Sequence, residues 1–481
     1  MPTSCLAAPQ TPKTAHTMNR KILRIAIPSI AQNVTVPLLG LADAAISGHL
    51  GGAEYIGAVA VGSMIFNMLY WLCAFLRMSI GGVTAQTYGA QDYEALPPIL
   101  LRSLRIALAI ALSFVLLQVP LEAFSFWLMD ATPEVEAHAR TYFRILIWGA
   151  PAVLSTYCFA GWYLGQQNAR FPMTVAIVQN VLNIAFSLFF VLVLGWKVEG
   201  VATGTLLAQW AGVAMYGVAP LRAPSPLPQA PLPSPHPEGD KAQTRGEASR
   251  YPLYKILANN IFKKGYAPKL NSSPGGGRGE GALFLRTLCM VAVQVWFTKY
   301  GAAQGDVLLA VNALLMQYYL LFSYVMDGFA YAGEAVGGSL CGARDRSGFL
   351  LLTKRLFLWG LGLTAVFTLV YIVGGAPFLS LLTDDRAVCE AARTYLPYAY
   401  LLPACGMATF LFDGLCIGTT SFRLMLLSVF CGGLTFFLLL QCPPLEAAAG
   451  SRNDLLWVAM LAFLAVRGLV QALFYHRILP V

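Results

Sequence analysis

Charged residues are scarce in this chain. Asp, Glu, Lys and Arg make up 11% of the 481 residues, whereas apolar residues make up 57%. A chain this long and this apolar does not fold as one soluble core. The composition therefore indicates a polytopic membrane protein, in which each crossing needs about 20 apolar residues.

Histidine and clustered cysteine are also in short supply. The five histidines lie in expected loops or tails, and no HExxH spacing occurs. The ten cysteines fall mostly in apolar stretches without a CxxC or a nearby histidine, so we interpret them as packing residues. A membrane-embedded enzyme would need a converging set of such groups. We therefore expect no enzyme activity, no metal and no cofactor.

The first seventeen residues lack the apolar core and the cleavage pattern of a signal peptide. We interpret residues 1–17 as a disordered extension. Met18, followed by Asn-Arg-Lys and the first apolar stretch, is the expected start.

Twelve apolar stretches are long enough to be transmembrane helices. They lie near 22–47, 55–80, 99–120, 139–163, 172–195, 199–219, 283–300, 306–330, 349–373, 395–417, 423–441 and 455–475. With the N-terminus inside, 24 of the 32 Lys and Arg residues, Arg286 and Arg467 among them, fall on the cytoplasmic side or at its interface, and the short loops alone still favour this orientation. We therefore expect a multi-pass inner (cytoplasmic) membrane protein with both termini cytoplasmic. The net charge of +9 reflects this topology rather than nucleic-acid binding.

The sequence repeats itself at a fixed offset of 253 residues. The matching positions are Gly48 and Gly52 with Gly301 and Gly305, Gly89-Ala90-Gln91-Asp92 with Gly342-Ala343-Arg344-Asp345, Arg140-Thr141-Tyr142 with Arg393-Thr394-Tyr395, Gly161 and Gly165 with Gly414 and Gly418, and Arg170 with Arg423. The pattern predicts an all-α fold of two homologous six-helix bundles, which are parallel because each repeat has an even number of spans. The expected bundles are 18–220 and 283–481, joined by 221–282, a cytoplasmic linker rich in proline and glycine.

The first predicted helix carries one carboxylate, Asp43, behind two prolines, Pro28 and Pro37. A charge at mid-bilayer costs about 2.5–3.5 kcal/mol on the lenient insertion scale, so it must be protonated, paired or hydrated. Such a carboxylate can couple proton binding to transport, while the prolines offer a place for the helix to bend. The alternative is that Asp43 only hydrogen-bonds a neighbouring helix.

Other polar groups within the predicted spans are further candidates. The fifth span holds Gln179, Asn180 and Asn183, and Thr203 and Thr205 follow in the sixth. These side chains are the expected hydrogen-bond partners of Asp43 if the first span packs on the fifth and sixth. The remaining carboxylates are Asp327, Glu334 and Asp413, of which Glu334 is expected at the membrane interface.

Flexible and aromatic side chains form a second set of candidates. Met64, Asn67 and Met68 lie on the second span, and Met316, Tyr318, Tyr319 and Phe322 lie on the eighth. Thioethers and aromatic rings suit a surface that accepts varied apolar or cationic molecules. Ordinary packing between helices is the alternative explanation. As substrate contacts we single out Met64, Asn67, Met68, Thr203, Met316 and Tyr319.

Several motifs together resemble a known family. They are Pro37-Leu38-Leu39-Gly40-Leu41-Ala42-Asp43, Gly48-His49-Leu50-Gly51, Phe75-Leu76-Arg77-Met78, Ala85-Gln86-Thr87-Tyr88-Gly89-Ala90 and Leu164-Gly165-Gln166-Gln167-Asn168-Ala169-Arg170. In this order they resemble the DinF-like branch of the MATE (multidrug and toxic compound extrusion) transporters. The resemblance implies a V-shaped, twelve-helix antiporter that works as a monomer and exports organic cations and other amphiphiles in exchange for protons or sodium.

The resemblance also implies roles for individual residues. Asp43 would be the protonation residue of the N-terminal lobe, Pro28 the bending point, and Asn180, Asn183 and Thr205 the polar surroundings of Asp43. Where some relatives carry a second carboxylate in the fifth helix, this chain has Ser187. This departure favours protons over sodium as the coupling ion.

Two other functions stay open from the sequence. A flippase of lipids or lipid-linked sugars would line its cavity with cationic residues, whereas Arg77 is nearly alone within the spans. A scaffold or receptor would have no need of Asp43, so replacing it with asparagine would change nothing. We expect alternating access, in which protonation of Asp43 releases substrate by bending the first helix.

Overall fold

The computed structural model describes residues 12–48, 50, 52–129, 132–222, 278–383, 385–442 and 451–480, and every regular element in these ranges is a helix. The first half forms α1 (Pro12–Gly48), α2 (Ala53–Leu72), α3 (Phe75–Gly89), α4 (Leu96–Leu116), α5 (Gln118–Met129), α6 (Pro133–Leu146), α7 (Ala150–Gly165), α8 (Arg170–Leu188) and α9 (Val198–Arg222). The second half forms α11 (Arg278–Ala302), α12 (Asp306–Gly342), α13 (Arg346–Leu382), α14 (Arg386–Gly418), α15 (Phe422–Leu440) and α17 (Arg452–Leu473). Short helical segments are η1 (Tyr93–Ala95), η2 (Ile147–Gly149), η3 (Phe189–Val193) and η5 (Tyr475–Ile478). The predicted all-α fold is confirmed.

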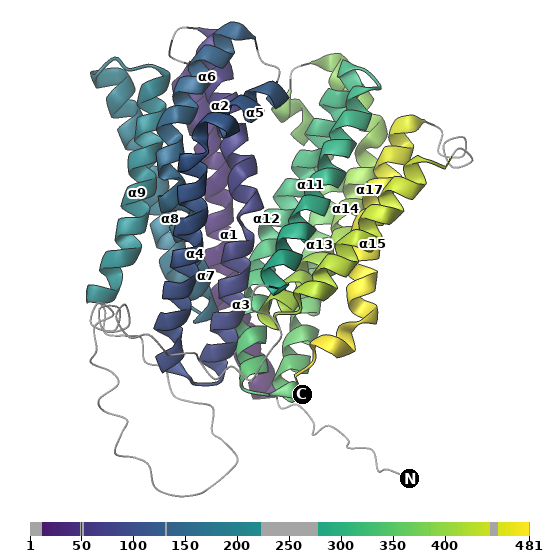
Figure 1. Ribbon diagram of the computed structural model, residues 1–481. Coiled ribbons are helices and arrows are strands. Elements are labelled where there is room, and N and C mark those ends of the chain that lie inside the picture. The colour runs from purple at the N-terminus through teal and green to yellow at the C-terminus, as the bar shows by residue number, and fades with distance from the viewer. Residues whose placement is uncertain are drawn as a thin grey trace, which may run out of the picture.

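The helices form two lobes side by side, one from each half of the chain (Figure 1). Eleven stretches of the described residues are long and apolar enough to cross a membrane. The remaining long helix is α9, which packs beside α8 and α6 at the position of the predicted sixth span. Its polar side chains include Thr203, Thr205 and Gln209. The start of α1 and the C-terminal η5 lie at the same end of the molecule (bottom of Figure 1).

Several helix boundaries differ from the predicted spans. The second span consists of α2 and α3, which meet at Cys73 and Ala74, and the eighth continues to Gly342 as α12. The helix α5, which the sequence analysis did not predict, presents Phe124 and Trp127 to the outside and buries Glu122. The N-terminal extension and the linker fall largely outside the described residues, although α1 begins within the former and α11 within the latter. The nine cysteines in the described ranges are free thiols.

Equivalent glycines pack equivalent helices inside each lobe. A Cβ added at Gly161 on α7 would lie 2.5 Å from the carbonyl oxygen of Arg77 on α3. A Cβ at Gly414 on α14 would overlap the carbonyl oxygen of Ala330 on α12 in the same way. Both partners in the second contact lie 253 residues after those in the first. Small residues let helix backbones touch in a membrane, so the sequence repeat corresponds to a repeated packing contact.

The two lobes meet along α3 and α12, again through paired glycines. A Cβ at Gly89 would overlap the carbonyl oxygen of Ser339, and a Cβ at Gly342 would overlap that of Gln86. Gln86 and Ser339 are themselves separated by the repeat offset of 253 residues. The reciprocal contacts place a pseudo-twofold axis between α3 and α12, at the end of the molecule where both helices terminate.

The helix α1 belongs to both lobes. Its first half buries Ile22, Ile25 and Ala26 in a core cluster made mostly of C-terminal-lobe residues. Its second half packs on α2 and α8 of the N-terminal lobe. Pro28 and Pro37 both lie inside this helix, which continues through them. A change of bend between its halves would move the N-terminal lobe relative to the C-terminal lobe.

Candidate functional site

Asp43 lies in the last quarter of α1, half-buried against the N-terminal lobe. Its carboxylate Oδ1 is buried and has no hydrogen-bond partner in the described part of the chain. Its backbone carbonyl accepts a hydrogen bond from Ser47 Oγ at 2.5 Å, which is a local helix contact. In the described part of the chain, no ion pair involves this carboxylate.

The amides predicted to hydrogen-bond Asp43 donate to other groups instead. Asn180 Nδ2 on α8 donates to the carbonyl oxygen of Thr35 on α1, at 3.3 Å. Asn183 Nδ2 donates to Thr205 Oγ1 on α9, at 3.0 Å. Asn183 and Ser187 are almost fully buried, and Asn183 Oδ1 and Ser187 Oγ have no partner among the described residues. Asp43 Oδ1, Asn183 Oδ1 and Ser187 Oγ are thus three of several buried oxygens in the N-terminal lobe that have no hydrogen-bond partner among the described residues.

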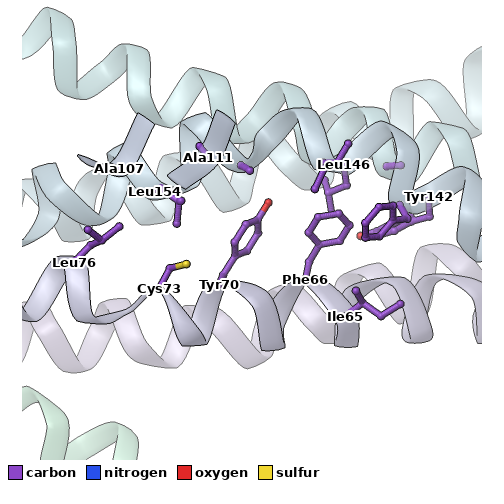
Figure 2. Packing of buried hydrophobic residues seen from close by; sticks show 14 of the residues in the cluster. Ile65, Phe66, Tyr70, Cys73, Leu76, Ala107, Ala111, Tyr142, Leu146 and Leu154 are labelled. Atoms are coloured by element: carbon purple, nitrogen blue, oxygen red, sulfur yellow. The ribbon is translucent and has the colours of Figure 1, made fainter. Parts of the chain in front are cut away.

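The sequence analysis missed Tyr142, which faces Asp43 from α6. The buried phenol interacts electrostatically with Asp43, and its hydroxyl lies 3.2 Å from Ser63 Oγ on α2. Figure 2 shows Tyr142 within the apolar core of this lobe, near Ile65 and Phe66. A tyrosine hydroxyl in an apolar core can indicate a functional residue. The helical periodicity of α6, however, fits an ordinary core residue equally well.

Glu334 lies in the interior, contrary to the predicted membrane-interface position. The side chain is completely buried on α12 and forms an ion pair with Arg77 on α3, with 3.3 Å between Glu334 Oε2 and Arg77 Nη1. The guanidinium also lies over the ring of Tyr331, 4.4 Å from its centre. The pair joins the two lobes beside the pseudo-twofold axis.

Asp413 lies at the centre of a second buried ion cluster, inside the C-terminal lobe. Its Oδ2 accepts hydrogen bonds from Arg286 on α11 at 2.5 Å and from Arg467 on α17 at 2.9 Å. Its Oδ1 accepts one from Gln471 at 2.6 Å. The sequence analysis had assigned both arginines to the cytoplasmic side or its interface, so Arg77 is not alone within the helices. We call these four residues the Asp413 cluster.

Asp327 lies on α12 between these two sites. It interacts electrostatically with Arg77, Arg286 and Asp413, and no hydrogen bond joins it to another described residue. Asp327 thus interacts with one residue of the inter-lobe ion pair and with two residues of the Asp413 cluster. The described residues contain no group of three or more His, Cys, Asp or Glu side chains placed to hold a metal ion.

The predicted substrate contacts are divided between the two lobes. Met64 and Asn67 are exposed on α2, whereas Met68, Thr203 and Tyr319 are half-buried. Met316 lines a recess of about 210 Å³ between α11 and α12. The recess is lined by Gln294, Phe297, Thr298, Gly301, Leu309, Asn312, Ala313, Met316, Gln317 and Leu320. This mixture of amide, thioether and apolar surface is suited to an uncharged or amphiphilic group.

Comparison with known proteins identifies the family. The family model MatE matches residues 28–189 and 281–439, which include α1 from Pro28 onward and the contact between α3 and α12. The chain belongs to the MatE family. Its MATE-type fold and its resemblance to the DinF-like branch are both confirmed.

Individual relatives support the same assignment. The DNA damage-inducible protein F of Escherichia coli (strain K12) is 32% identical over 95% of this chain and 92% of its own length. The probable multidrug resistance protein NorM of Thermotoga maritima is 25% identical over 40% of this chain and 43% of its own. The crystal structure of the Vibrio cholerae MATE transporter VcmN in the bent form has a TM-score of 0.77 at 17% identity, over 97% of this chain and 98% of that one. The chain is therefore a multi-pass membrane transporter of the MATE type.

Proposed function

We propose that this MATE transporter is a monomeric antiporter that exports organic cations and other amphiphiles in exchange for protons. The observation that carries the proposal is the state of Asp43: a carboxylate with a buried, unpartnered oxygen. Asp43 lies on α1, the helix that packs on both lobes. Both termini are cytoplasmic in this proposal, in agreement with the excess of Lys and Arg in the short loops at that side.

The coupling follows from the two attachments of α1. Asn180 holds the second half through the carbonyl of Thr35, while Asn33 Nδ2 on the same helix donates to the carbonyl of Tyr324 on α12 at 3.0 Å. Protonation of Asp43 removes a charge next to Tyr142 and changes how the second half packs on its lobe. The helix then bends at Pro28 or Pro37, each of which lacks the backbone N–H that would hold the preceding turn. Proton and substrate are exchanged because each favours a different bend.

Sodium is the second candidate ion, and one observation favours it. Besides Asp43 Oδ1, the oxygens of Asn183 and Ser187 are buried and unpartnered in the same lobe, and oxygen atoms are the usual ligands of hard cations. Ser187 supplies a neutral hydroxyl, so the only charged oxygens in this set are those of Asp43. A single carboxylate is enough for a proton, whereas a sodium site gains from a second charge.

The test is transport by purified protein in vesicles. A fluorescent cationic dye is followed under an imposed proton gradient and, separately, under a sodium gradient. We expect proton-driven transport that Asp43→Asn abolishes, while the matched variant Asp92→Asn keeps it, because Asp92 only caps η1 in a loop. Transport driven by sodium alone would favour the second candidate. Equal rates for Asp43→Asn and wild type would refute the role of Asp43.

A further inference from the structure

A small recess lies between the starts of α1 and α13, far along α1 from Asp43. It has a volume of about 180 Å³ and is lined by Asn19, Arg355, Leu358 and Trp359. The first residue comes from the N-terminal half of the chain and the other three from the C-terminal half. We call it the α1–α13 recess. The coupling site does not involve these residues.

Two polar atoms in the recess have no partner. The Arg355 Nε donor and the Asn19 Oδ1 acceptor are both buried, and neither forms a hydrogen bond with a described residue. A buried polar group without a partner is destabilising, so a ligand that satisfies both is favoured. A guanidinium is the side chain that best matches a phosphate group. An amide oxygen next to it accepts a hydrogen bond from a hydroxyl of the same ligand.

The surroundings of the recess change from basic to apolar along both helices. Arg355 lies nine residues after the start of α13, which is roughly 13 Å along a helix. Lys354 beside it is exposed, and one turn further Leu358 and Leu361 are 50% and 55% exposed. On α1 the exposed Arg20 is followed by Ile27, which is 60% exposed. Charged groups followed by apolar ones at this spacing match a lipid headgroup and its acyl chains.

The aromatic residue of the recess fits the same position. Trp359 is half-buried and packs on Phe329 of α12, with 6.0 Å between the ring centres. Tryptophan is enriched at the level of the headgroups, where one side of the ring is apolar and the other hydrated. A soluble phosphate would not need the exposed leucines. The apolar surface therefore favours a lipid as the source of the phosphate.

We propose that the α1–α13 recess binds the phosphate headgroup of an anionic phospholipid in the cytoplasmic leaflet. Arg355 donates to the phosphate, Asn19 accepts from a headgroup hydroxyl such as that of a glycerol, and the acyl chains follow Leu358 and Leu361. The choice of leaflet rests on the orientation proposed above, whereas the binding chemistry does not. Because the lipid contacts both helices, it fastens the first half of α1 to the C-terminal lobe.

The experiment uses the full-length protein in a neutral detergent. Phosphatidylglycerol is titrated in, with native mass spectrometry to count bound lipid and thermal unfolding to measure stabilisation. We expect Arg355→Gln to weaken phosphatidylglycerol binding about fivefold, the factor for one cationic contact near an anionic leaflet. The matched control Lys354→Gln removes a neighbouring charge outside the recess, and we expect it to change binding less than twofold.

Two further arms separate the sources of the ligand. Phosphatidylcholine tests the need for net negative charge, and soluble glycerol phosphate tests a phosphate without acyl chains. Neither is expected to stabilise the protein at concentrations where phosphatidylglycerol does. The proposal would be overturned if either compound stabilised the protein as much as phosphatidylglycerol does. It would also be overturned if Arg355→Gln and Lys354→Gln lost the same amount of phosphatidylglycerol binding. If Arg355→Gln does not fold, Arg355→Lys and Asn19→Ala carry the test, since each removes one of the two contacts but leaves the net charge unchanged.

Discussion

Arg77 and Glu334 form an ion pair that joins the two lobes on one side of the pseudo-twofold axis only. Glu334 occupies the position equivalent to Gly81, and a Cβ at Gly81 would overlap the Glu334 carboxylate. The residue equivalent to Arg77 is Ala330, which cannot form a second pair. The missing side chain of Gly81 therefore provides the space in which the carboxylate of the other lobe meets its arginine.

The pair is expected to hold the lobes together in the interior, between the start of α3 and the last third of α12. Breaking a buried pair by removing one partner costs about 3–5 kcal/mol. In Arg77→Gln the buried Glu334 can regain water only if the lobes separate there. We expect faster amide hydrogen exchange in 82–95 and 339–348, measured by mass spectrometry, whereas Arg102→Gln on the exposed face of α4 serves as the control.

The double variant Arg77→Gln with Glu334→Gln distinguishes a charge effect from a packing effect. Residues in direct contact typically couple by about 0.5–3 kcal/mol, so the second substitution should restore part of the slow exchange. Exchange as slow as that of wild type in Arg77→Gln alone would mean that the pair does not hold the lobes together.

The glycine contacts between the lobes give a second prediction. In Gly89→Ala and Gly342→Ala the new methyl group would meet a backbone carbonyl, which cannot rotate away. We expect both variants to disfavour contact at the end where α3 and α12 terminate and to increase the rate at which trypsin cleaves at Arg344, which is exposed in the loop between α12 and α13. Gly362→Ala has open space around it and serves as the control, with an expected gain of up to about 1 kcal/mol from helix propensity. Cleavage at the wild-type rate in Gly89→Ala and Gly342→Ala would contradict this account of the interface.

The Asp413 cluster is expected to stabilise the C-terminal lobe. Asp413→Asn leaves Arg286 and Arg467 buried without a counter-ion, which should cost about 3–5 kcal/mol of unfolding free energy. The control Asp385→Asn changes an exposed N-cap to another good cap and should be nearly neutral. Thermal unfolding in detergent compares the two variants. If Asp413→Asn and Asp385→Asn unfold at the same temperature, the Asp413 cluster does not stabilise the C-terminal lobe.

The ion pairs of α5 predict a dependence of stability on pH. Glu122 is 6% exposed and accepts hydrogen bonds from Arg140 at 2.8 Å and from Arg144 at 3.0 Å. Burial raises the pKa of a carboxyl group, but the hydrogen bonds from Arg144 and Arg140 outweigh it, so the pKa of Glu122 lies below its ordinary value. A carboxyl group with a lowered pKa stabilises the fold above its unfolded pKa, and this contribution is lost as the pH falls through the folded pKa.

The test compares Glu122→Gln with wild type at several pH values. We expect a loss of about 1 kcal/mol at neutral pH, a modest figure because both arginines are partly exposed. The difference should begin to shrink as the pH falls below the ordinary glutamate pKa of about 4.3 and vanish below the lower pKa of the folded state, where the wild-type carboxyl is protonated. Glu134→Gln, at an exposed position of α6, should show a smaller difference at neutral pH. A difference for Glu122→Gln that persists unchanged in acid would contradict the charge assignment.

The fold could be predicted from the sequence because apolar length and the repeat are both visible there. An offset of 253 residues identifies Gly161 with Gly414, and the structure shows the same helix contact at both. The polar side chains of α8 could be singled out for a similar reason, because an amide in an apolar run, such as Asn183, differs from its neighbours.

The ion pairs could not be predicted in the same way. Arg286 lies near the start of α11 and Arg467 near the end of α17, where the sequence pattern alone also fits an arginine facing lipid headgroups. Which way such a side chain points depends on the neighbouring helix, here on Asp413 of α14. Glu334 was misplaced for the same reason, since its partner Arg77 lies 257 residues away in the sequence.

The most direct test of the coupling mechanism is a measurement of proton release on substrate binding. A cationic substrate is added to the purified protein in a weakly buffered detergent solution near neutral pH, and the pH change is recorded. If proton and substrate exclude each other through Asp43, wild type should release up to about one proton per bound substrate, and Asp43→Asn should bind the substrate without releasing any. Substrate binding to wild type with no proton release, or equal release from Asp43→Asn, would contradict the account.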